Sequence, residues 1–207
     1  DKAAAESARG LIEIDKAKKA ISEGLQQAGD AAWKGNASAD AEAMVKAARG
    51  VAQGPGELVV GCGSSHEELI NACIKTSESL AQLLANGRGA SRTSPDPAVQ
   101  KKVDDAAQRA ARACVNLLEA CKAGSKSQSL QTQAKISTSA REAADGLHEV
   151  VSAANMLPGG GDLTLEEDTG EDLDALAEKE LEACAKVIEN AARSLDNQKV
   201  CIDEEKL

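Results

Sequence analysis

Residues Val103 to Cys121 read VDDAAQRAARACVNLLEAC, and this stretch decides the fold. Small or apolar residues recur in it at three- and four-residue steps, which is the spacing of one face of an α-helix. They are Val103, Ala106, Ala107, Ala110, Ala111, Cys114, Leu117, Leu118 and Cys121. Small side chains let helix axes approach closely, and the Leu pair fills a wider layer. The stretch is therefore predicted to be one buried helix of a close-packed bundle.

Three other segments carry the same register, starting from Met44, Leu69 and Ile136. In each, small or apolar residues recur at offsets 3, 4, 7, 8, 11, 14, 15 and 18, and successive starts lie 25 to 34 residues apart. A repeat of this length is typical of helix arrays. Because a lone Ala-rich amphipathic helix is only marginally stable in water, each stripe must be covered by its neighbours.

Caps and helix breakers predict an all-α chain, an antiparallel five-helix bundle with an additional sixth helix. Ser38, the Ser65–Glu68 capping box and Asp96-Pro97 predict helix starts. Gly54-Pro55-Gly56 is expected to kink or split the second helix, because Pro55 has no amide hydrogen to donate. Gly87 to Ser94 are predicted to form a loop. The predicted helices span about 2–28, 38–60, 65–86, 96–123, 127–156 and 171–198.

The predicted helices divide the chain into three parts. We expect a bundle over 1–157, an acidic, Gly-containing linker over 158–170, and a helix of a following bundle in 171–207. The chain starts at Asp1 without a Met, which suggests a fragment of a longer protein.

Composition narrows the function classes. There is no Phe or Tyr and one Trp, and the formal net charge is -10. An acidic chain repels phosphate backbones, and without aromatic side chains it lacks stacking platforms for bases, so nucleic acid is not an expected partner. No apolar run reaches the roughly 20 residues of a membrane span, and the N-terminus lacks the order of a signal peptide. The sequence therefore predicts a cytoplasmic chain without membrane insertion.

The six cysteines are scattered, with no CxxC pair and no His at ligand spacing. They are interpreted as small core thiols rather than as disulfide or metal ligands. They are Cys62, Cys73, Cys114, Cys121, Cys184 and Cys201.

The stripe of an apolar first position, paired Ala and a Leu-Leu ending resembles the helices of the talin rod. The segments HEELI at 66–70, SLAQLL at 79–84 and DPAVQ at 96–100 look like successive helices of a talin five-helix bundle. The segment EDLDALAEKEL at 171–181 is similar to the helix upstream of the C-terminal I/LWEQ actin-binding module. The order resembles the penultimate rod bundle followed by the first helix of the next.

The resemblance implies a non-enzymatic cytoskeletal scaffold at the cell cortex that links adhesion complexes to actin, mainly through an adjoining module. It also implies that some rod helices are cryptic vinculin sites. The candidate here is the fourth helix, with Val103, Ala106, Ala107, Ala110, Ala111, Cys114, Leu117 and Leu118. Plain core packing explains the same stripe and stays open. An alternative function is an endocytic, actin-linking clathrin-coat adaptor of the huntingtin-interacting type.

Other chemistry-bearing residues give weaker signals. His66 and His148 lack a Cys or Ser partner at informative spacing, so no catalytic residue, small-molecule substrate or cofactor is expected. The acidic run at 166–172 lacks the pattern of a calcium loop, and a solvated charge run is favoured over a metal site. Trp33 is expected to cover the bundle end, with a partner contact as the alternative.

Overall fold

The computed structural model describes residues 2–63, 66–127 and 129–165, with the backbone alone for 2–7, 62–63 and 66. The chain divides into two units, Asp1–Gly170 and Glu171–Leu207, and every described residue lies in the first. All regular secondary structure in that described part is helical, and it contains no strand. Its helices are α1 (Lys2–Gly29), α2 (Ala41–Gly63), α3 (His66–Ser91), α4 (Pro97–Lys126) and α5 (Leu130–Ala154). The all-α prediction is confirmed here, while the predicted sixth helix falls outside the described residues.

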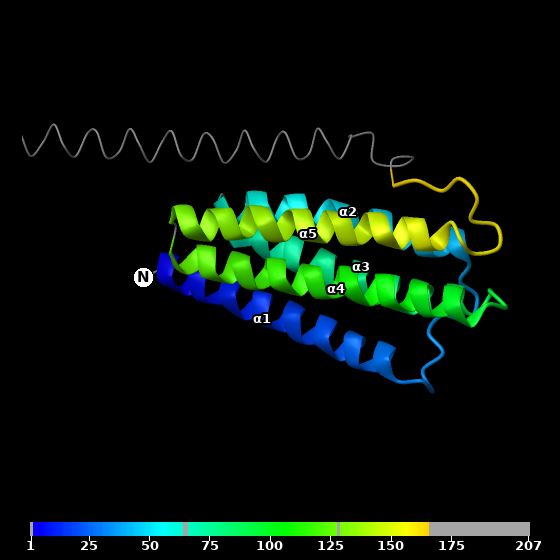
Figure 1. The fold of residues 1–207 in the computed structure, drawn as a ribbon. Coiled ribbons are helices and arrows are strands. Elements are labelled where there is room, and N and C mark those ends of the chain that lie inside the picture. Colours follow the sequence, from blue (N-terminus) through cyan, green and yellow to red (C-terminus); the bar gives the residue numbers. More distant parts are fainter. Residues whose placement is uncertain (1, 64–65, 128, 166–207) are drawn as a thin grey trace, which may run out of the picture. The chain divides into compact units, whose positions relative to one another are not determined.

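Successive helices run antiparallel, so α1, α3 and α5 point one way and α2 and α4 the other (Figure 1). Four of the helices form a closed ring of contacts: α2 packs on α3, α3 on α4, α4 on α5, and α5 on α2. We call these four helices the α2–α5 ring. The remaining helix, α1, packs against α3 and α4. The bundle is therefore a four-helix ring with a fifth helix laid against one side.

Aliphatic side chains fill the interior. The fully buried side chains with the largest volumes include Ile14, Met44, Leu58, Leu80, Leu83, Leu117, Leu118 and Leu147. Alanines occupy many of the remaining buried positions, which lets helix axes come close. At one close contact between the α4 and α5 backbones, a Cβ added to Gly146 would lie 3.0 Å from the Cα of Ala110.

The prediction that Gly54-Pro55-Gly56 could split the second helix is wrong, because α2 runs unbroken from Ala41 to Gly63 with Pro55 inside it. Gly54 and Pro55 are both buried. A Cβ on Gly54 would lie 2.3 Å from Oγ1 of Thr76 in α3, so the glycine lets α3 approach closely. Burial against α3 offsets the hydrogen bond that proline removes, and tertiary packing overrides the local preference.

The predicted loop from Gly87 to Ser94 is also largely wrong, since α3 continues to Ser91. The glycines here serve packing rather than chain reversal. A Cβ on Gly87 would lie 3.1 Å from the Cβ of Ala107, and one on Gly89 would lie 1.6 Å from the carbonyl oxygen of Asn36. Gly124 also serves packing. It does not end α4, which runs to Lys126, and a Cβ built on it would lie 2.7 Å from Cδ1 of Ile136 in α5.

Helix starts are set by side chains close to the predicted ones. Asp40, not Ser38, begins α2, where its Oδ1 accepts a hydrogen bond from the Ala43 amide at 2.9 Å. Ser129, not Ser127, caps α5 and forms a capping box with Thr132. Asp96 caps α4, with Pro97 at its first turn, as predicted. Such shifts of two residues are expected where several Ser and Asp residues compete for one cap.

Residues 155–165 fold back onto the bundle. The Asn155 side chain makes two hydrogen bonds of 3.0 Å with the backbone of Leu163. The Arg49 guanidinium donates to the carbonyl oxygen of Thr164 at 2.7 and 3.0 Å. Leu157 and Leu165 are buried. The first residues of the predicted 158–170 linker are thus packed against the bundle, and the others fall outside the described residues.

Candidate functional site

The predicted partner-binding residues lie together on one face of α4. We call them the α4 seam: Val103, Ala106, Ala107, Ala110, Ala111, Cys114, Leu117 and Leu118. Every one of them is at most 2% exposed. The prediction that this stripe is buried is therefore confirmed. Whether it binds a partner is a separate question.

Three different helices cover this face of α4. Ala110 contacts α5 at Gly146, and Ala107 contacts α3 at Gly87. One turn beyond the α4 seam, the Cys121 Sγ lies 4.0 Å from the carbonyl oxygen of Leu58 in α2. A partner can reach the α4 seam only after α4 has separated from these neighbours, because close-packed interiors leave no space for another side chain.

Local sequence explains why α4 forms so firmly. The Asp96 Oδ1 accepts a hydrogen bond of 2.8 Å from the Ala98 amide, and Pro97 presets the first helical turn. The Gln100 side chain donates to the carbonyl oxygen of Ser94 at 2.7 Å, which ties the first turn to the preceding chain. α4 is thus a well-capped helix with one continuous apolar face.

The α4 seam carries no reactive group at neutral pH. Burial raises the pKa of the Cys114 thiol to about 12, so the thiol stays protonated and is a poor nucleophile. Cys73 and Cys121 are also buried, as predicted for core thiols. The side chain of Cys62 and the positions of Cys184 and Cys201 lie outside the described residues. Among the residues that the structure describes, no three His, Cys, Asp or Glu side chains are grouped to hold a metal ion.

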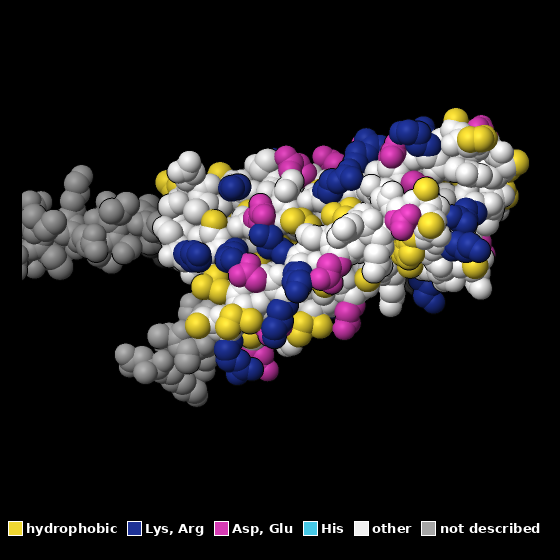
Figure 2. Space-filling model, turned by 90° about the horizontal axis from the view of Figure 1, so that it is seen from below, with side chains coloured by type: hydrophobic (Ala, Val, Ile, Leu, Met, Phe, Trp, Pro, Cys, Tyr) yellow, Lys and Arg dark blue, Asp and Glu magenta, His cyan; other side chains and the backbone are white. Residues whose placement is uncertain are grey.

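On its outer side, α4 is joined to α1 by four charged residues that we call the ionic edge: Asp15 and Lys18 of α1, Glu119 and Lys122 of α4. Lys122 Nζ lies 2.6 Å from Asp15 Oδ2, and Lys18 Nζ lies 2.8 Å from Glu119 Oε1. The hydrogen bond from Lys122 lowers the pKa of Asp15, and that from Lys18 lowers the pKa of Glu119. Figure 2 shows this side of the bundle, where basic and acidic side chains alternate without a patch of one sign.

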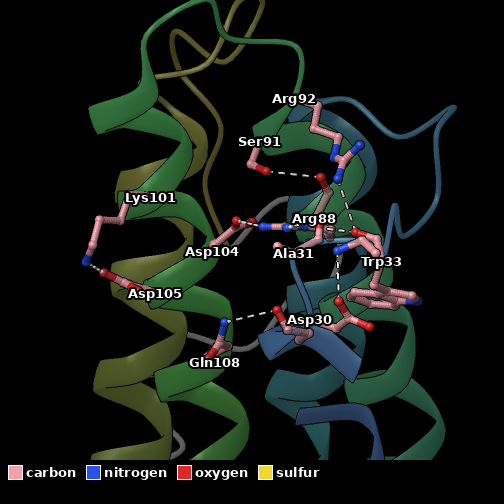
Figure 3. Close-up of polar contacts among 12 residues, drawn as sticks. Asp30, Ala31, Trp33, Arg88, Ser91, Arg92, Lys101, Asp104, Asp105 and Gln108 are labelled. Atoms are coloured by element: carbon pink, nitrogen blue, oxygen red, sulfur yellow. Dashed lines mark hydrogen bonds and ion pairs between the residues drawn. The ribbon is translucent and has the colours of Figure 1, made fainter. Parts of the chain in front are cut away.

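Beyond the C-terminal end of α1, basic residues of α3 hold the chain between α1 and α2 (Figure 3). The Arg88 Nε donates to the carbonyl oxygen of Trp33 at 3.1 Å, and Arg92 donates to the same oxygen at 3.2 Å. Arg88 also forms a partly buried ion pair with Asp104 of α4. The Asn36 amide donates to the carbonyl oxygen of Ala85 at 2.9 Å. We call Arg88, Arg92 and Asp104 together the loop clamp.

Two of the sequence predictions concern residues in or next to the loop clamp. Trp33 lies at the bundle end in a loop and is partly buried, as expected, but its backbone carbonyl makes the polar contacts. The role of Arg88 was missed, because it lies in a segment predicted to be a loop and its partner Trp33 is 55 residues away. Had residues 87–91 been predicted as helix, Arg88 would have been assigned to the third helix, which packs on the fourth.

The remaining candidates do not join this site. His148 is exposed on α5, and the side chain of His66 lies outside the described residues. The acidic run from 166 to 172 is also outside them. Of the helices in the described part, none combines the length and the apolar character needed to cross a lipid bilayer.

Comparison with known proteins places the chain. Talin-B of Dictyostelium discoideum is 33% identical over 192 residues, a match that covers 92% of this chain and 7% of Talin-B. The chain is a relative of the talins. Talin-A of the same organism is 44% identical over 71 residues, which cover 34% of this chain and 3% of Talin-A. No protein-family profile matches the chain.

The predicted resemblance to talin is thereby confirmed. The match to Talin-B leaves few residues of this talin-related chain unaligned, so α4 and its seam lie within it. The chain spans less than a tenth of the length of either talin, and it corresponds to one segment of a much longer protein.

Proposed function

We propose that this talin-related chain is a non-enzymatic segment of a cytoskeletal rod, located in the cytoplasm at the cell cortex. In this role it forms part of the link between adhesion complexes and actin. The relation to Talin-B and Talin-A supports this function over that of an endocytic clathrin-coat adaptor. A closed bundle of antiparallel helices, with an aliphatic interior, is also suited to a segment that bears tension along its length.

Within this role, α4 serves as a cryptic binding helix for vinculin. The observation that carries the proposal is the α4 seam, a continuous apolar face that is at most 2% exposed in the folded bundle. Amphipathic helices bind helical partners by laying such a face into an apolar groove. A partner that needs the α4 seam binds the open bundle alone, and so shifts the population toward it.

The direct test uses a peptide of residues 98–123 and the vinculin head. A complex should form at or below tens of micromolar, roughly −6 kcal/mol of binding free energy. The matched control replaces Leu117 and Leu118 by Ala, which removes the largest apolar side chains of the face and should abolish the complex. No binding of the unchanged peptide at about that concentration would end the proposal.

A second arm uses the whole chain, in which the α4 seam is covered. Wild-type chain should bind the vinculin head much more weakly than the peptide does. Leu147→Ala in α5, a position 1% exposed, should destabilise the bundle and increase binding. If the intact chain binds as tightly as the peptide, then the site is not cryptic.

Actin binding is assigned to an adjoining module rather than to this segment. The chain has a formal net charge of -10 and F-actin is also acidic, so long-range repulsion opposes their contact. We expect little or no co-sedimentation of the chain with F-actin. Robust pelleting at physiological salt would contradict this assignment.

A further inference from the structure

The contacts of α1 differ in kind from those of the other helices. Each member of the α2–α5 ring packs on the ring members beside it, whereas α1 packs on α3 and α4 from outside. If α1 moved away, the contacts that close the ring would remain, namely α2 on α3, α3 on α4, α4 on α5 and α5 on α2. The contacts that close the ring therefore do not depend on α1.

The burial along α1 is thin. Over residues 8–29, the part of α1 whose side chains the structure describes, the buried apolar side chains are Ile14, Ala17, Ile21 and Ala28, whereas α4 buries ten apolar side chains. Leu11 and Leu25 of α1 are only partly covered. The ionic edge adds little, because exposed ion pairs in water contribute little to stability. Ile14 and Ile21 are the largest buried side chains in the described part of α1, so they contribute much of the apolar contact that holds α1 against α3 and α4.

The loop clamp binds the chain that follows α1 to α3, a helix of the ring. It holds the Trp33 carbonyl on α3, and Asn36 is held by its amide on Ala85 and by its side chain on Asn86 at 2.9 Å. Gly35 has a φ of +61° and a Cβ there would lie 2.5 Å from the Ala85 carbonyl oxygen, so the chain lies directly on α3 at this point. These contacts do not involve α1. The chain from Trp33 onward thus belongs structurally to the ring.

Between the two parts lies a short turn, Gly29–Ala32. Its short hydrogen bonds are local: the Asp30 amide donates to the Gln27 oxygen at 3.0 Å, the Ala32 amide to Asp30 Oδ1 at 2.8 Å, and the Trp33 amide to the Asp30 oxygen at 3.1 Å. All four of its residues are exposed, and nothing lies within 4 Å of a Cβ built on Gly29. The contacts from this region to the ring are long hydrogen bonds: 3.4 Å from Arg88 to the Ala31 oxygen, and 3.5 Å from Gln108 to the Ala28 oxygen. A side chain at Gly29 would thus meet no packed group, and these two hydrogen bonds to the ring are both long.

We propose that α1 lifts from α3 and α4 as a unit, turning at Gly29–Ala32, while the loop clamp keeps the α2–α5 ring closed. The lifted state uncovers the face of α3 and α4 beneath α1, including Leu84, which faces Gly24 across a gap of 3.2 Å to a built Cβ. It leaves covered the α4 residues that face α2 and α5. Opening of α1 is thus a first step, separate from exposure of the α4 seam, and it does not require vinculin.

The test is hydrogen exchange by mass spectrometry on the full chain, with two matched isoleucine variants. Ile21→Ala in α1 and Ile136→Ala in α5 remove the same groups from positions that are 2% and 7% exposed. Ile21→Ala should speed exchange in α1 at least about tenfold, because a buried Ile is lost, and leave α4 and α5 within about twofold. Ile136→Ala should speed exchange in the ring helices. If Ile21→Ala speeds α1, α4 and α5 equally, the bundle opens as one unit and the proposal is wrong.

Alkylation of Cys121, read by mass spectrometry, gives an independent measurement, since its Sγ faces Leu58 in α2 and reports opening of the ring. Its rate should be unchanged by Ile21→Ala and increased by Ile136→Ala. Should Ile21→Ala fail to fold, exchange of the wild-type chain in low urea decides: α1 must show an opening with a smaller urea dependence than α4. Equal urea dependence for both helices would overturn the proposal.

The role of the loop clamp has its own double variant, Arg88→Met with Arg92→Met, which removes the side-chain contacts to the Trp33 oxygen and to Asp104 but keeps two long apolar stems. With the clamp removed, the Asn36 amide should exchange together with α1. With the clamp intact, it should exchange together with α3. An Asn36 amide that follows α1 in the wild-type chain would place the turning point elsewhere and contradict the proposal.

Discussion

Two helices of nearly equal length, α1 with 28 residues and α4 with 30, carry apolar stripes of the same spacing and yet hold different positions in the fold. α4 is a member of the ring and packs against all four other helices, while α1 packs against α3 and α4 alone among the larger helix contacts of the described part. The difference teaches that helical periodicity shows which face is buried, but not how many helices bury it. The number of neighbours, rather than the stripe, sets what a helix contributes to stability.

The largest expected effect comes from the centre of α4. Leu118→Ala removes a side chain that is 0% exposed and should lower the free energy of unfolding by about 2 to 5 kcal/mol, through lost burial and the cavity left behind. Urea unfolding followed by circular dichroism measures this change. The matched α1 variant is Ile14→Ala, also 0% exposed, and the surface control is Ile12→Ala, 53% exposed.

Comparison of these variants sharpens the contrast between the helices. Ile14→Ala should affect the ring less than Leu118→Ala does, because α1 can leave while the ring stays closed. Fluorescence of Trp33, the one Trp of the chain, follows the loop clamp during the same titration. Equal losses for Ile14→Ala and Leu118→Ala, with a single coincident transition, would remove the distinction between α1 and α4.

A smaller effect is expected where α4 meets α5. Gly146→Ala would place a Cβ 3.0 Å from the Cα of Ala110, a backbone atom that cannot move alone. The strain of about 1 to 3 kcal/mol should exceed the roughly 1 kcal/mol that Ala gains over Gly in a helix. Gly29→Ala at the end of α1, where nothing lies within 4 Å, is the control. Net stabilisation by Gly146→Ala would show that the α4 and α5 backbones separate easily.

The sequence predicted the α4 seam but not its surroundings, and the reason is physical. A stripe such as Val103 to Leu118 depends on local spacing, which a single segment contains. Helix continuity through Pro55 and through Gly87 depends on contacts with Thr76 and Ala107, which belong to other helices. The loop clamp joins Arg88 to Trp33 across 55 residues and depends on where α1 ends relative to α3. Features that depend on the residues of one helix could therefore be predicted from the sequence. Features that depend on contacts between two helices could not.

A gain of about 1 kcal/mol is expected at Thr76 of α3. Its side chain is 0% exposed, and its Oγ1 has no hydrogen-bond partner within the described part of the chain. Thr76→Val replaces a buried, unsatisfied hydroxyl by a methyl group of similar size, which removes its desolvation cost. Thermal unfolding should shift upward, and Thr76→Ser, which keeps the hydroxyl and loses a methyl group, should shift it downward. A loss of stability in Thr76→Val would show that the hydroxyl has a partner when the protein is in water.

The smallest expected effect is the pH dependence of α1 docking. Lys122 and Lys18 lower the pKa values of Asp15 and Glu119 in the folded chain. A carboxylate with a lowered folded pKa stabilises the docked helix above its unfolded pKa, near 4, and that contribution is lost as the pH falls through the folded pKa. Hydrogen exchange in α1, corrected for the intrinsic rate, should therefore speed up by about twofold to fivefold between pH 6 and pH 3.

The matched variant for this pH dependence is Asp15→Asn with Glu119→Gln, which keeps the size of both side chains and cannot titrate. Other carboxylates also take up protons in this range, so the quantity that matters is the difference between wild type and the double variant. That difference should appear in α1 and be absent from the ring-facing amides of α4, because the ionic edge holds one helix to the ring and not the ring to itself. High salt should reduce it, since both pairs are partly exposed to water. If α4 responds as strongly as α1, then protonation of the ionic edge loosens the whole bundle, and the two helices are held by one cooperative core.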